Sequence, residues 1–422
     1  MRDGGRISAA IELIEDILGR GRPARLALKA WGDAARYAGA KDRAFVSGLT
    51  LDALRRRRSI AWRMDDESPR ALALGVLRCA WGWEAARLIQ AVEEPHGPGP
   101  GTAAELAQLD APRNLADAPA PVRGDYADWM DPYLERVFGE ARAAEGGALA
   151  ERAPTDLRVN TLRTDVARAL RALAPLGAVQ APFLETALRV AAPAAAERGA
   201  PVEAAPEFEK GWFEVQDLGS QLAAACAGDL AGRQVLDFCA GGGGKTLALA
   251  AAMNNTGQIF AYDADARRLT DTVRRGRRAA VRNLQVRSPL QPAPLADLEG
   301  RMDLVFIDAP CTGSGTWRRH PDTKWRLRRE QLERRMAEQD EVLSAAVPYV
   351  KPGGRLLYAT CSLFAEENED RLDLFLSRFP AFSPVSVELP AMAPPNSAGR
   401  LRLTPLSHGT DGFFVAVLQR NP

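Results

Sequence analysis

Apolar residues in the second half of the chain come in short runs that alternate with helical patterns. Val235, Leu236 and Phe238 form the first run, and four glycines at 241–244 follow at once. Short apolar runs separated by helical stretches are typical of buried parallel strands in an α/β sheet. Four later runs lie in the segments QIFAYDAD, MDLVFIDAPC, RLLYATCS and GFFVAVLQ. The pattern predicts a Rossmann-like, doubly wound sheet.

The first hundred residues have a different pattern, with apolar residues at helical spacing. Ile7, Ile11, Ile14 and Ile17 fall on one face of a predicted helix, and further helical patterns follow. A stretch rich in Pro and Gly comes next, and then a region that mixes strand and helix patterns. The predicted domains are an all-α domain at 1–94, a linker at 95–124, a small α+β subdomain at 125–222 and the sheet domain at 223–422.

Length, charge and cysteine content limit the expected number of domains, the types of site and the cellular compartment. A chain of 422 residues is expected to form two or three domains. The formal net charge is only +1, but arginines gather locally, for example at 55–58 and 318–335. Five cysteines without CxxC pairs, and three scattered histidines, predict no metal site and no disulfide framework. The amphipathic start does not resemble a signal peptide and no long apolar run follows, so we expect a cytoplasmic monomer.

The glycine-rich turn after the first strand is the candidate cofactor cradle. Glycines allow a backbone to approach a ligand closely, and the following helix presents its N-terminus to it. Two nucleotide-binding motifs fit poorly, because a P-loop needs a glycine at Cys239 and the dinucleotide motif needs one near Thr246. Asp263, at the end of the second strand, suits ribose hydroxyls. The predicted cofactor-binding residues are Cys239, Ala240, Gly241, Gly242, Gly243, Gly244, Lys245, Asp263 and Asp308.

Two cysteines end later strands of the predicted sheet. Cys311 follows Asp308 and Pro310 at one strand end, and Cys361 lies at another. Ligands of open α/β sheets bind outside the carboxyl ends of the strands, so these residues are expected to converge. A buried cysteine is usually a small packing residue, and we assign that role to the other three, Cys79, Cys226 and Cys239.

The motifs DFCAGGGGKT, FIDAPCTGSGTWRRHPDTKW and YATCSLFAEENED, in this order, resemble those of the Sun family of RNA cytosine-5 methyltransferases. The likeness also includes LRVNTLR, FEVQDLGSQL and the closing DGFFVAVL, over roughly residues 125–422, and the N-terminal region is similar to NusB-like helical domains. The resemblance implies S-adenosylmethionine as cofactor and RNA, most often ribosomal RNA, as substrate.

The resemblance also implies roles for single residues. It makes Cys361 the nucleophile that adds to C6 of cytosine, and it gives Cys311 a part in product release. Asp308 would contact the N3 and N4 edge of the base, and Lys245 would lie near the cofactor or the reacting base. The implied RNA-binding residues are Arg318, Arg319, His320, Lys324, Arg158 and Asn160. Structural packing is an equally good interpretation of Arg158 and Asn160.

One departure from the family pattern concerns adenine recognition. Members carry Gly-Asp at the end of the third strand, but this chain has Ser288, Pro289 and Leu290 there, with Asp297 as a possible replacement. Two alternatives to the methyltransferase therefore stay open, a catalytically idle RNA-binding assembly factor and a P-loop-like nucleotide-binding protein. After Cys361, Glu366 to Glu369 are interpreted as residues that favour the start of a helix.

Overall fold

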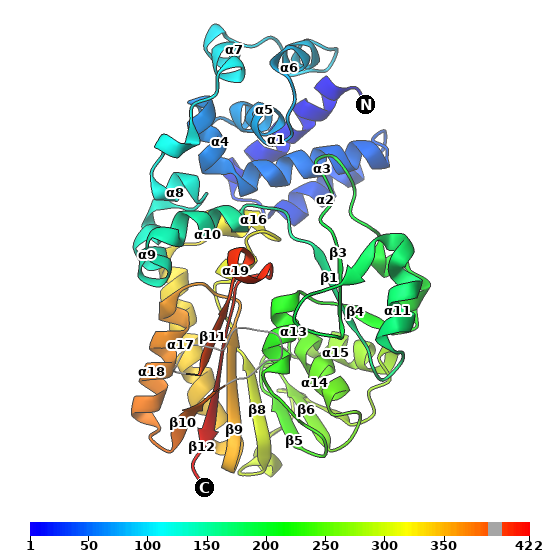
Figure 1. The fold of residues 1–422 in the computed structure, drawn as a ribbon, viewed down its shortest axis with the longest axis vertical. Helices are drawn as coiled ribbons and strands as arrows, with labels where there is room; N and C mark the ends of the chain where they lie inside the picture. The colour runs from blue at the N-terminus through cyan, green and yellow to red at the C-terminus, as the bar shows by residue number, and fades with distance from the viewer. Residues whose placement is uncertain (387–398) are drawn as a thin grey trace. The chain divides into compact units, whose positions relative to one another are not determined.

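The computed structural model describes residues 1–386 and 399–422, which cluster into two compact units (Figure 1). We call them the helical unit and the sheet unit. The helical unit comprises residues 1–153, 192–199 and 316–327, and the sheet unit comprises residues 154–191, 200–315 and 328–422.

The helical unit is built from short amphipathic helices around one apolar core. Ile7, Ile14 and Ile17 of α1 are buried in this core, as their spacing predicts, with Leu49 and Leu74 from later helices. The α-helices are α1 (Asp3–Arg20), α2 (Ala24–Ala34), α3 (Ala40–Arg55), α4 (Arg57–Met64), α5 (Pro69–Cys79), α6 (Ala85–Val92), α7 (Ala103–Asp110), α8 (Ala120–Arg123), α9 (Asp131–Phe138), α10 (Arg142–Leu149) and α16 (Pro321–Arg326). Short 3₁₀ turns are η1 (Leu115–Asp117), η2 (Asp128–Met130) and η3 (Gly139–Ala141).

The stretch expected to be a linker has regular structure of its own. Residues 95–124 contain α7, η1 and α8, and α7 packs against α4, α5 and α6. Arg70 of α5 also binds this stretch, through Glu105 and the carbonyl oxygens of Pro98 and Gly99. Residues 125–153 cluster with the helices, although we expected them in the α+β subdomain. The functional division into domains stays a prediction.

The sheet unit contains a small antiparallel sheet and a large mixed one. The small sheet has the order β2-β3-β1-β4, with β1 (Thr155–Val159), β2 (Ala178–Gln180), β3 (Ala187–Val190) and β4 (Phe213–Val215). Its buried residues, such as Leu157 and Phe213, pack against Leu173 of α11 (Val166–Leu173). Shorter elements here are η4 (Ala174–Leu176), η5 (Val202–Ala204) and α12 (Pro206–Glu209).

The large sheet confirms the predicted α/β architecture. Its order is β10-β12-β9-β8-β5-β6-β7, with β11 paired to β12. The five neighbouring strands β9, β8, β5, β6 and β7 run parallel to one another. Strand β12 runs antiparallel to β9, β10 and β11. The strands are β5 (Gln234–Asp237), β6 (Gln258–Tyr262), β7 (Leu284–Arg287), β8 (Met302–Asp308), β9 (Val350–Thr360), β10 (Phe382–Val385), β11 (Arg400–Leu403) and β12 (Phe413–Arg420).

Helices cover both faces of this sheet because alternate strand residues point to opposite sides. Leu304 and Phe306 face a core that includes Leu222 and Leu249, whereas Val305 faces a second core. Figure 1 shows α13 to α15 beside one face and α17 and α18 beside the other. These helices are α13 (Leu218–Ala225), α14 (Gly244–Ala252), α15 (Ala266–Arg278), α17 (Arg329–Ala346) and α18 (Glu369–Arg378), and the remaining elements are α19 (Pro405–His408) and η6 (Ala296–Leu298), η7 (Ser314–Thr316), η8 (Val347–Tyr349) and η9 (Ala365–Glu367).

The strand order places a candidate site at the carboxyl ends of β5, β8 and β9. From β5 the chain crosses over first to β6 and β7 on one side and then to β8 and β9 on the other. Such a reversal opens a crevice outside the carboxyl ends of the central strands, where α/β proteins bind ligands. No helix in the described part of the chain is long and apolar enough to cross a membrane.

Asn160 joins the small sheet to α15. Its Nδ2 donates to the carbonyl oxygens of Gly211 and Ala279, at 2.8 and 2.9 Å, and the residue is 2% exposed. Asn160→Ala would leave two buried carbonyl groups without donors, and we expect it to lower the free energy of unfolding by about 2 kcal/mol or more. Urea denaturation followed by circular dichroism measures this, with Thr164→Ala in the neighbouring turn as control. Unchanged stability with weaker RNA binding would instead support a direct RNA contact.

Candidate active site

Lys245 and Asp308 form an ion pair at the carboxyl edge of the sheet. Asp308 ends β8, and Lys245 lies in the first turn of α14, so that Nζ and Oδ2 are 2.7 Å apart. Burial lowers the pKa of Lys245, but the carboxylate of Asp308 outweighs it and the pKa is raised overall. The ammonium is therefore a permanent positive charge in this crevice near neutral pH.

The two strand-end cysteines lie side by side. The Sγ atoms of Cys311 and Cys361 are 3.4 Å apart, within the distance of a sulfur hydrogen bond. Their hydrogen bond and burial together raise the pKa of Cys311 well above its usual value. Lys245 belongs to the same cluster, because Cys361 contributes electrostatically to its raised pKa and its Nζ lies 5.2 Å from the ring centroid of Phe413. The structure thus brings together all four residues that the sequence proposes as catalytic.

A buried carboxylate binds the two cysteine loops to each other. Glu367 accepts hydrogen bonds from the backbone N–H and the hydroxyl of Thr312, which follows Cys311. It also accepts from the hydroxyl of Ser362, which follows Cys361, and from Gln339 of α17 at 3.0 Å. Glu367 is 0% exposed, and burial raises its pKa. The carboxylate of Glu367 therefore links Thr312 to Ser362, and so fixes the loops of the two cysteines relative to each other.

Further hydrogen bonds fix the loop around Cys361. Asn368 accepts from the hydroxyl of Thr360 at 2.6 Å and donates to the carbonyl oxygen of Ser362 at 3.0 Å. Gly315 donates its N–H to the carbonyl oxygen of Cys361 at 2.9 Å. The expected helix start is confirmed, because Asn368 is the N-cap residue of α18 and Glu369 lies in its first turn. The side chains of Glu367 and Asn368 are in addition buried and bound to the loops of Cys311 and Cys361, which the sequence did not predict.

Hydrogen bonds with Asp263 and with helix α15 fix the backbone of the glycine turn. Asp263 accepts the N–H of Gly241 at 2.8 Å, and Thr272 donates its hydroxyl to the carbonyl oxygen of the same glycine at 2.9 Å. Gly241 and Gly243 have φ angles of +53° and +83°, which residues other than glycine rarely adopt. Arg275 donates to the carbonyl oxygen of Gly242 at 2.6 Å. The turn is thus a preformed loop.

Asp237 is a site residue that the sequence analysis did not propose. It ends β5, and its Oδ2 accepts the hydroxyl of Thr246 at 2.6 Å, while its Oδ1 is buried without a hydrogen-bond partner. Burial raises the pKa of Asp237 to about 7. The signal that could have revealed it is an acidic residue between a buried strand and a glycine turn. A carboxyl group with an unused buried oxygen at this position fits a ligand that carries an N–H or O–H donor.

Comparisons with known proteins agree with this geometry. Residues 229–419 match the family described as 16S rRNA methyltransferase RsmB/F. The chain is 35% identical over 305 residues to ribosomal RNA small subunit methyltransferase B of Cronobacter sakazakii, covering 70% of this chain and 67% of that protein. The same enzyme of Escherichia coli is 35% identical over 318 residues, covering 74% and 69% of the two chains.

The crystal structure titled PH0851 is also similar, with a TM-score of 0.73 and 25% identity over 100% of this chain and 99% of that one. This chain belongs to the RsmB/F family. It is therefore an S-adenosylmethionine-dependent RNA methyltransferase. The described residues contain no cluster of His, Cys, Asp or Glu that could hold a metal ion.

Several residues that we proposed for RNA binding in this RsmB/F protein are buried. In the helical unit, Arg318 is 4% exposed and Lys324 is 1% exposed. The ammonium of Lys324 donates to the carbonyl oxygen of Arg55 at 3.0 Å, and burial lowers its pKa to about 8. Arg319 is half-buried, and His320 is exposed. The burial favours a packing role for Lys324, and RNA contacts by the other three residues stay a prediction.

In the sheet unit, Arg158 and Asn160 are also buried. Arg158 donates to the side chain of Gln216 at 2.8 Å and to the carbonyl oxygen of Leu247 at 3.3 Å, in α14. Both residues therefore bind neighbouring elements of their own unit, which favours the packing interpretation. Arg158 has a further consequence for the site, because it attaches the small sheet to the helix that carries Lys245.

The end of β7 lacks an acid in the structure as in the sequence. Ser288 accepts the N–H of Leu290 through its hydroxyl at 3.3 Å, and Leu290 is 83% exposed. Asp297, the possible replacement, accepts a hydrogen bond from Arg287 at 2.8 Å. One oxygen of Asp297 is therefore engaged by Arg287, and its side chain is 54% exposed.

Glu367→Gln tests the link between the cysteine loops. An amide cannot accept hydrogen bonds at its nitrogen, so one group of donors would lose its acceptor and the loops would separate. We expect kcat to fall roughly 10- to 100-fold with little change in KM for RNA, because small displacements of reacting groups are costly. Steady-state methylation assays measure this, with Glu330→Gln on the exposed start of α17 as control. Unchanged kcat would show that the carboxylate does not position the thiols.

Asp237→Asn tests the raised pKa beneath the glycine turn. A buried acid with a raised pKa favours the folded state in its protonated form, so its contribution to stability falls as pH rises from about 4 to about 7. A shift from 3.8 to about 7 corresponds to about 4 kcal/mol as an upper limit. The variant should remove this part of the pH dependence in denaturation curves between pH 4 and 7. Identical pH profiles of the two proteins would show that Asp237 ionises normally.

Proposed function

We propose that this RsmB/F methyltransferase methylates C5 of a cytosine in 16S ribosomal RNA through a covalent bond between Cys361 and C6 of the base. The single observation that carries the proposal is the 3.4 Å distance between the Cys311 and Cys361 sulfur atoms beside the Lys245–Asp308 pair. C5 of cytosine is a weak nucleophile, and covalent addition at C6 converts it into an enamine carbon. Cysteine suits this addition because its thiolate is a strong nucleophile near neutral pH.

The surroundings of the two thiols support different roles for them. The ammonium of Lys245 interacts with Cys361 and attracts negative charge on its sulfur. The hydrogen bond with Cys361 and burial together raise the pKa of Cys311, so its thiol holds its proton. We therefore assign the attack on C6 to Cys361. Cys311 acts after methyl transfer, when the C5 proton leaves and the bond between Cys361 and C6 breaks.

Asp308 is placed to recognise the base. One of its oxygens accepts from Lys245, and its side chain is 35% exposed, so the carboxylate can also accept from the N4 amino group of a bound cytosine, and from N3 when that nitrogen is protonated. A hydrogen bond at this edge stabilises positive charge on the ring, which favours addition of a thiolate at C6. A base inside a duplex could not reach these atoms, so the target nucleotide must be unpaired or flipped out.

The residues of the glycine turn fit the cofactor. When bound, S-adenosylmethionine supplies an electrophilic methyl group for C5. A Cβ added at Gly242 or Gly244 would meet no atom closer than 3.6 Å, so the outer side of the turn is open to a ligand. The unused Oδ1 of Asp237 can accept a hydrogen bond there, and Asp263 lies at the end of β6 where it can bind ribose hydroxyls.

One observation favours a second candidate, an RNA-binding assembly factor without catalytic activity. Residues 288–290, which follow β7, include no acid, and one oxygen of Asp297 accepts from Arg287. Calorimetry with S-adenosylmethionine separates the two candidates, since an idle factor need not bind it. The P-loop-like alternative has no such support, because family membership and the paired thiols both indicate methyl transfer to a base.

Replacement of each cysteine tests the assignment of roles. Cys361→Ala should abolish both methylation and the covalent RNA adduct, because no thiol can then add to C6. Cys311→Ala should accumulate an adduct that survives denaturing gel electrophoresis, because its resolution is impaired. The substrate is unmodified 16S rRNA with radiolabelled S-adenosylmethionine, and Cys226→Ala in the core of the sheet unit is the control. An adduct in Cys361→Ala but none in Cys311→Ala would reverse the two roles.

A further inference from the structure

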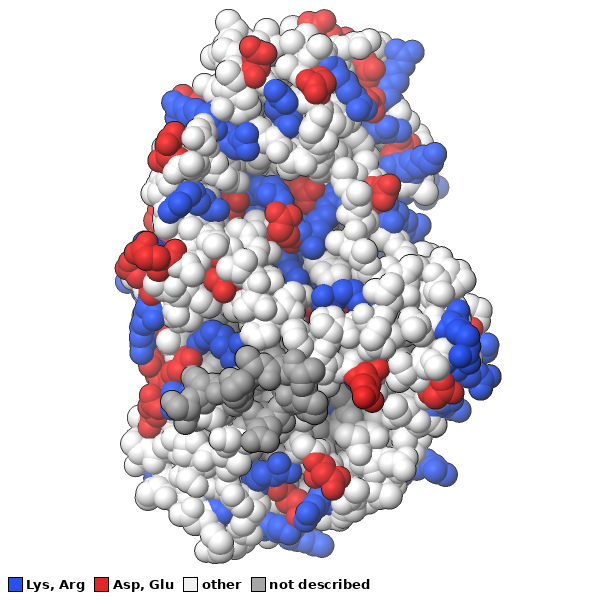
Figure 2. All heavy atoms as spheres, viewed as in Figure 1, with Lys and Arg blue, Asp and Glu red and all other residues white. Residues whose placement is uncertain are grey.

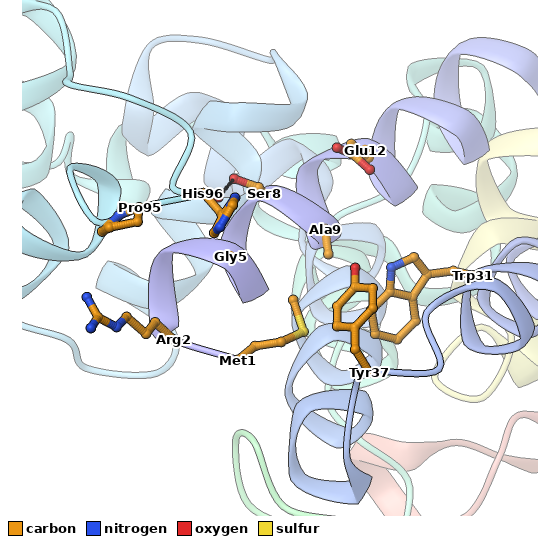
Figure 3. Close-up of a pocket in the computed structure, with 10 residues that line it drawn as sticks. All are labelled: Met1, Arg2, Gly5, Ser8, Ala9, Glu12, Trp31, Tyr37, Pro95 and His96. Atoms are coloured by element: carbon orange, nitrogen blue, oxygen red, sulfur yellow. Dashed lines mark hydrogen bonds between the residues drawn. The ribbon is translucent and has the colours of Figure 1, made fainter.

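A cavity in the helical unit lies outside the site described above. It has a volume of about 680 Å³ and lies between α1, α2 and the turn at Pro95 and His96. Figure 3 shows Trp31 and Tyr37 close together on one side of it, with Arg2 and His96 on the other. This volume is in the range of small-molecule pockets, and it is ample for one nucleotide.

Two aromatic side chains form one wall of this pocket. Tyr37 lies in the short loop between α2 and α3 and is 74% exposed, although a large apolar ring is usually at least half-buried. Trp31 is half-buried at the edge of the apolar core, with part of its ring toward the cavity. Exposed aromatic rings in a concave site offer flat surfaces on which an unpaired base can stack.

Three exposed cations line the pocket or lie close in sequence to Tyr37. On the face in Figure 2, basic and acidic side chains are interspersed. Arg2 lines the pocket, Arg36 precedes Tyr37, and Lys41 begins α3; all three are exposed. Within residues 1–386 and 399–422, none of the three forms an ion pair.

A salt bridge fixes the start of α3, which carries Lys41, against α1. Arg6 of α1 binds Asp42, the neighbour of Lys41, through Nη2 at 2.7 Å and through Nε at 2.8 Å. Asp42 also accepts the N–H of Gly39 at 2.9 Å, which fixes the loop that carries Tyr37. The start of α3 is therefore held against α1. Arg2 lines the pocket, and Arg36 and Lys41 lie within four residues of Tyr37 in the chain, so their positive charges can attract phosphate groups near it.

We propose that this pocket binds an unpaired nucleotide of the RNA substrate, remote in sequence from the methylated cytosine. The base stacks on Tyr37 and Trp31, and the flanking phosphates contact Arg2, Arg36 and Lys41. Glu12 also lines the pocket and is a hydrogen-bond acceptor only, so it repels phosphate and accepts N–H groups of the base. The identity of the RNA rests on the proposed function, but the existence of the site does not.

Binding of a fluorescein-labelled single-stranded RNA of mixed sequence to the full chain tests the stacking wall. Tyr37→Ala should weaken binding about 5- to 100-fold, as expected for the loss of one base–aromatic stack, whereas Tyr37→Phe should stay within about 2-fold. Ultraviolet cross-linking followed by mass spectrometry should place the cross-link on Trp31 or Tyr37. Equal binding by wild type and Tyr37→Ala, or cross-links elsewhere, would overturn the proposal.

A matched pair of double variants tests the cations. Arg36→Ala/Lys41→Ala should weaken binding and reduce the salt dependence by about 0.7 in log–log slope for each phosphate that the variant no longer neutralises. Arg25→Ala/Lys29→Ala removes the same charge from exposed, unpaired positions on a different face of α2 from Trp31. This control should bind almost normally. Equal losses in both double variants would indicate a general electrostatic attraction and no site.

Methylation assays separate this proposal from the proposed function. The pocket variants should raise KM for 16S rRNA and leave kcat unchanged, because they lie outside the catalytic residues. Cys361→Ala should bind RNA normally and fail only in methyl transfer. If the wild type does not methylate RNA, the proposed function fails, and the binding and cross-linking measurements still decide whether the pocket exists. A fall in kcat with unchanged KM would contradict the pocket.

Discussion

The parallel pairing of β8 with β9 is the constraint on which the candidate active site depends. Asp308 lies opposite Ala359 in this register, so the loops that begin after the two strands leave the sheet side by side. Cys311 and Cys361 are 50 residues apart in the chain, and this pairing brings their loops to the same edge of the sheet. A shift of the register by one residue would turn every side chain of the strand to the other face and separate the thiols.

Register alone does not determine the distance between two loop residues, and Glu367 supplies the remaining constraint. A carboxylate can accept several hydrogen bonds at once, and here its donors come from both loops and from α17. Burying a charge is costly unless it is hydrogen-bonded, and the raised pKa of Glu367 reflects that cost. The group is nevertheless useful at this position because an apolar side chain could not hold two polar loops together.

The order of strands and helices in the sheet unit could be predicted from the sequence, because buried parallel strands are short apolar runs and helices separate them. The convergence of Cys311, Cys361 and Asp308 followed from the same argument about strand ends. Glu367 and Asp237 could not be identified, since their importance comes from burial and from donors distant in sequence. For the same reason the helix start at Asn368 and Glu369 could be predicted, but the contacts of Glu367 and Asn368 with the loops of Cys311 and Cys361 could not.

The structure also distinguishes buried basic residues from exposed ones, which cannot be told apart in the sequence. Lys324 lies in a motif next to the catalytic loop, yet its ammonium is buried and bound to a backbone carbonyl. Arg36 and Lys41 belong to no motif, yet they are exposed beside an exposed tyrosine. A basic side chain contributes most free energy to phosphate binding when it is exposed to water and forms no ion pair with an acidic residue. Positive charges that remain unpaired are therefore better indicators of an RNA contact than the density of arginine along the chain.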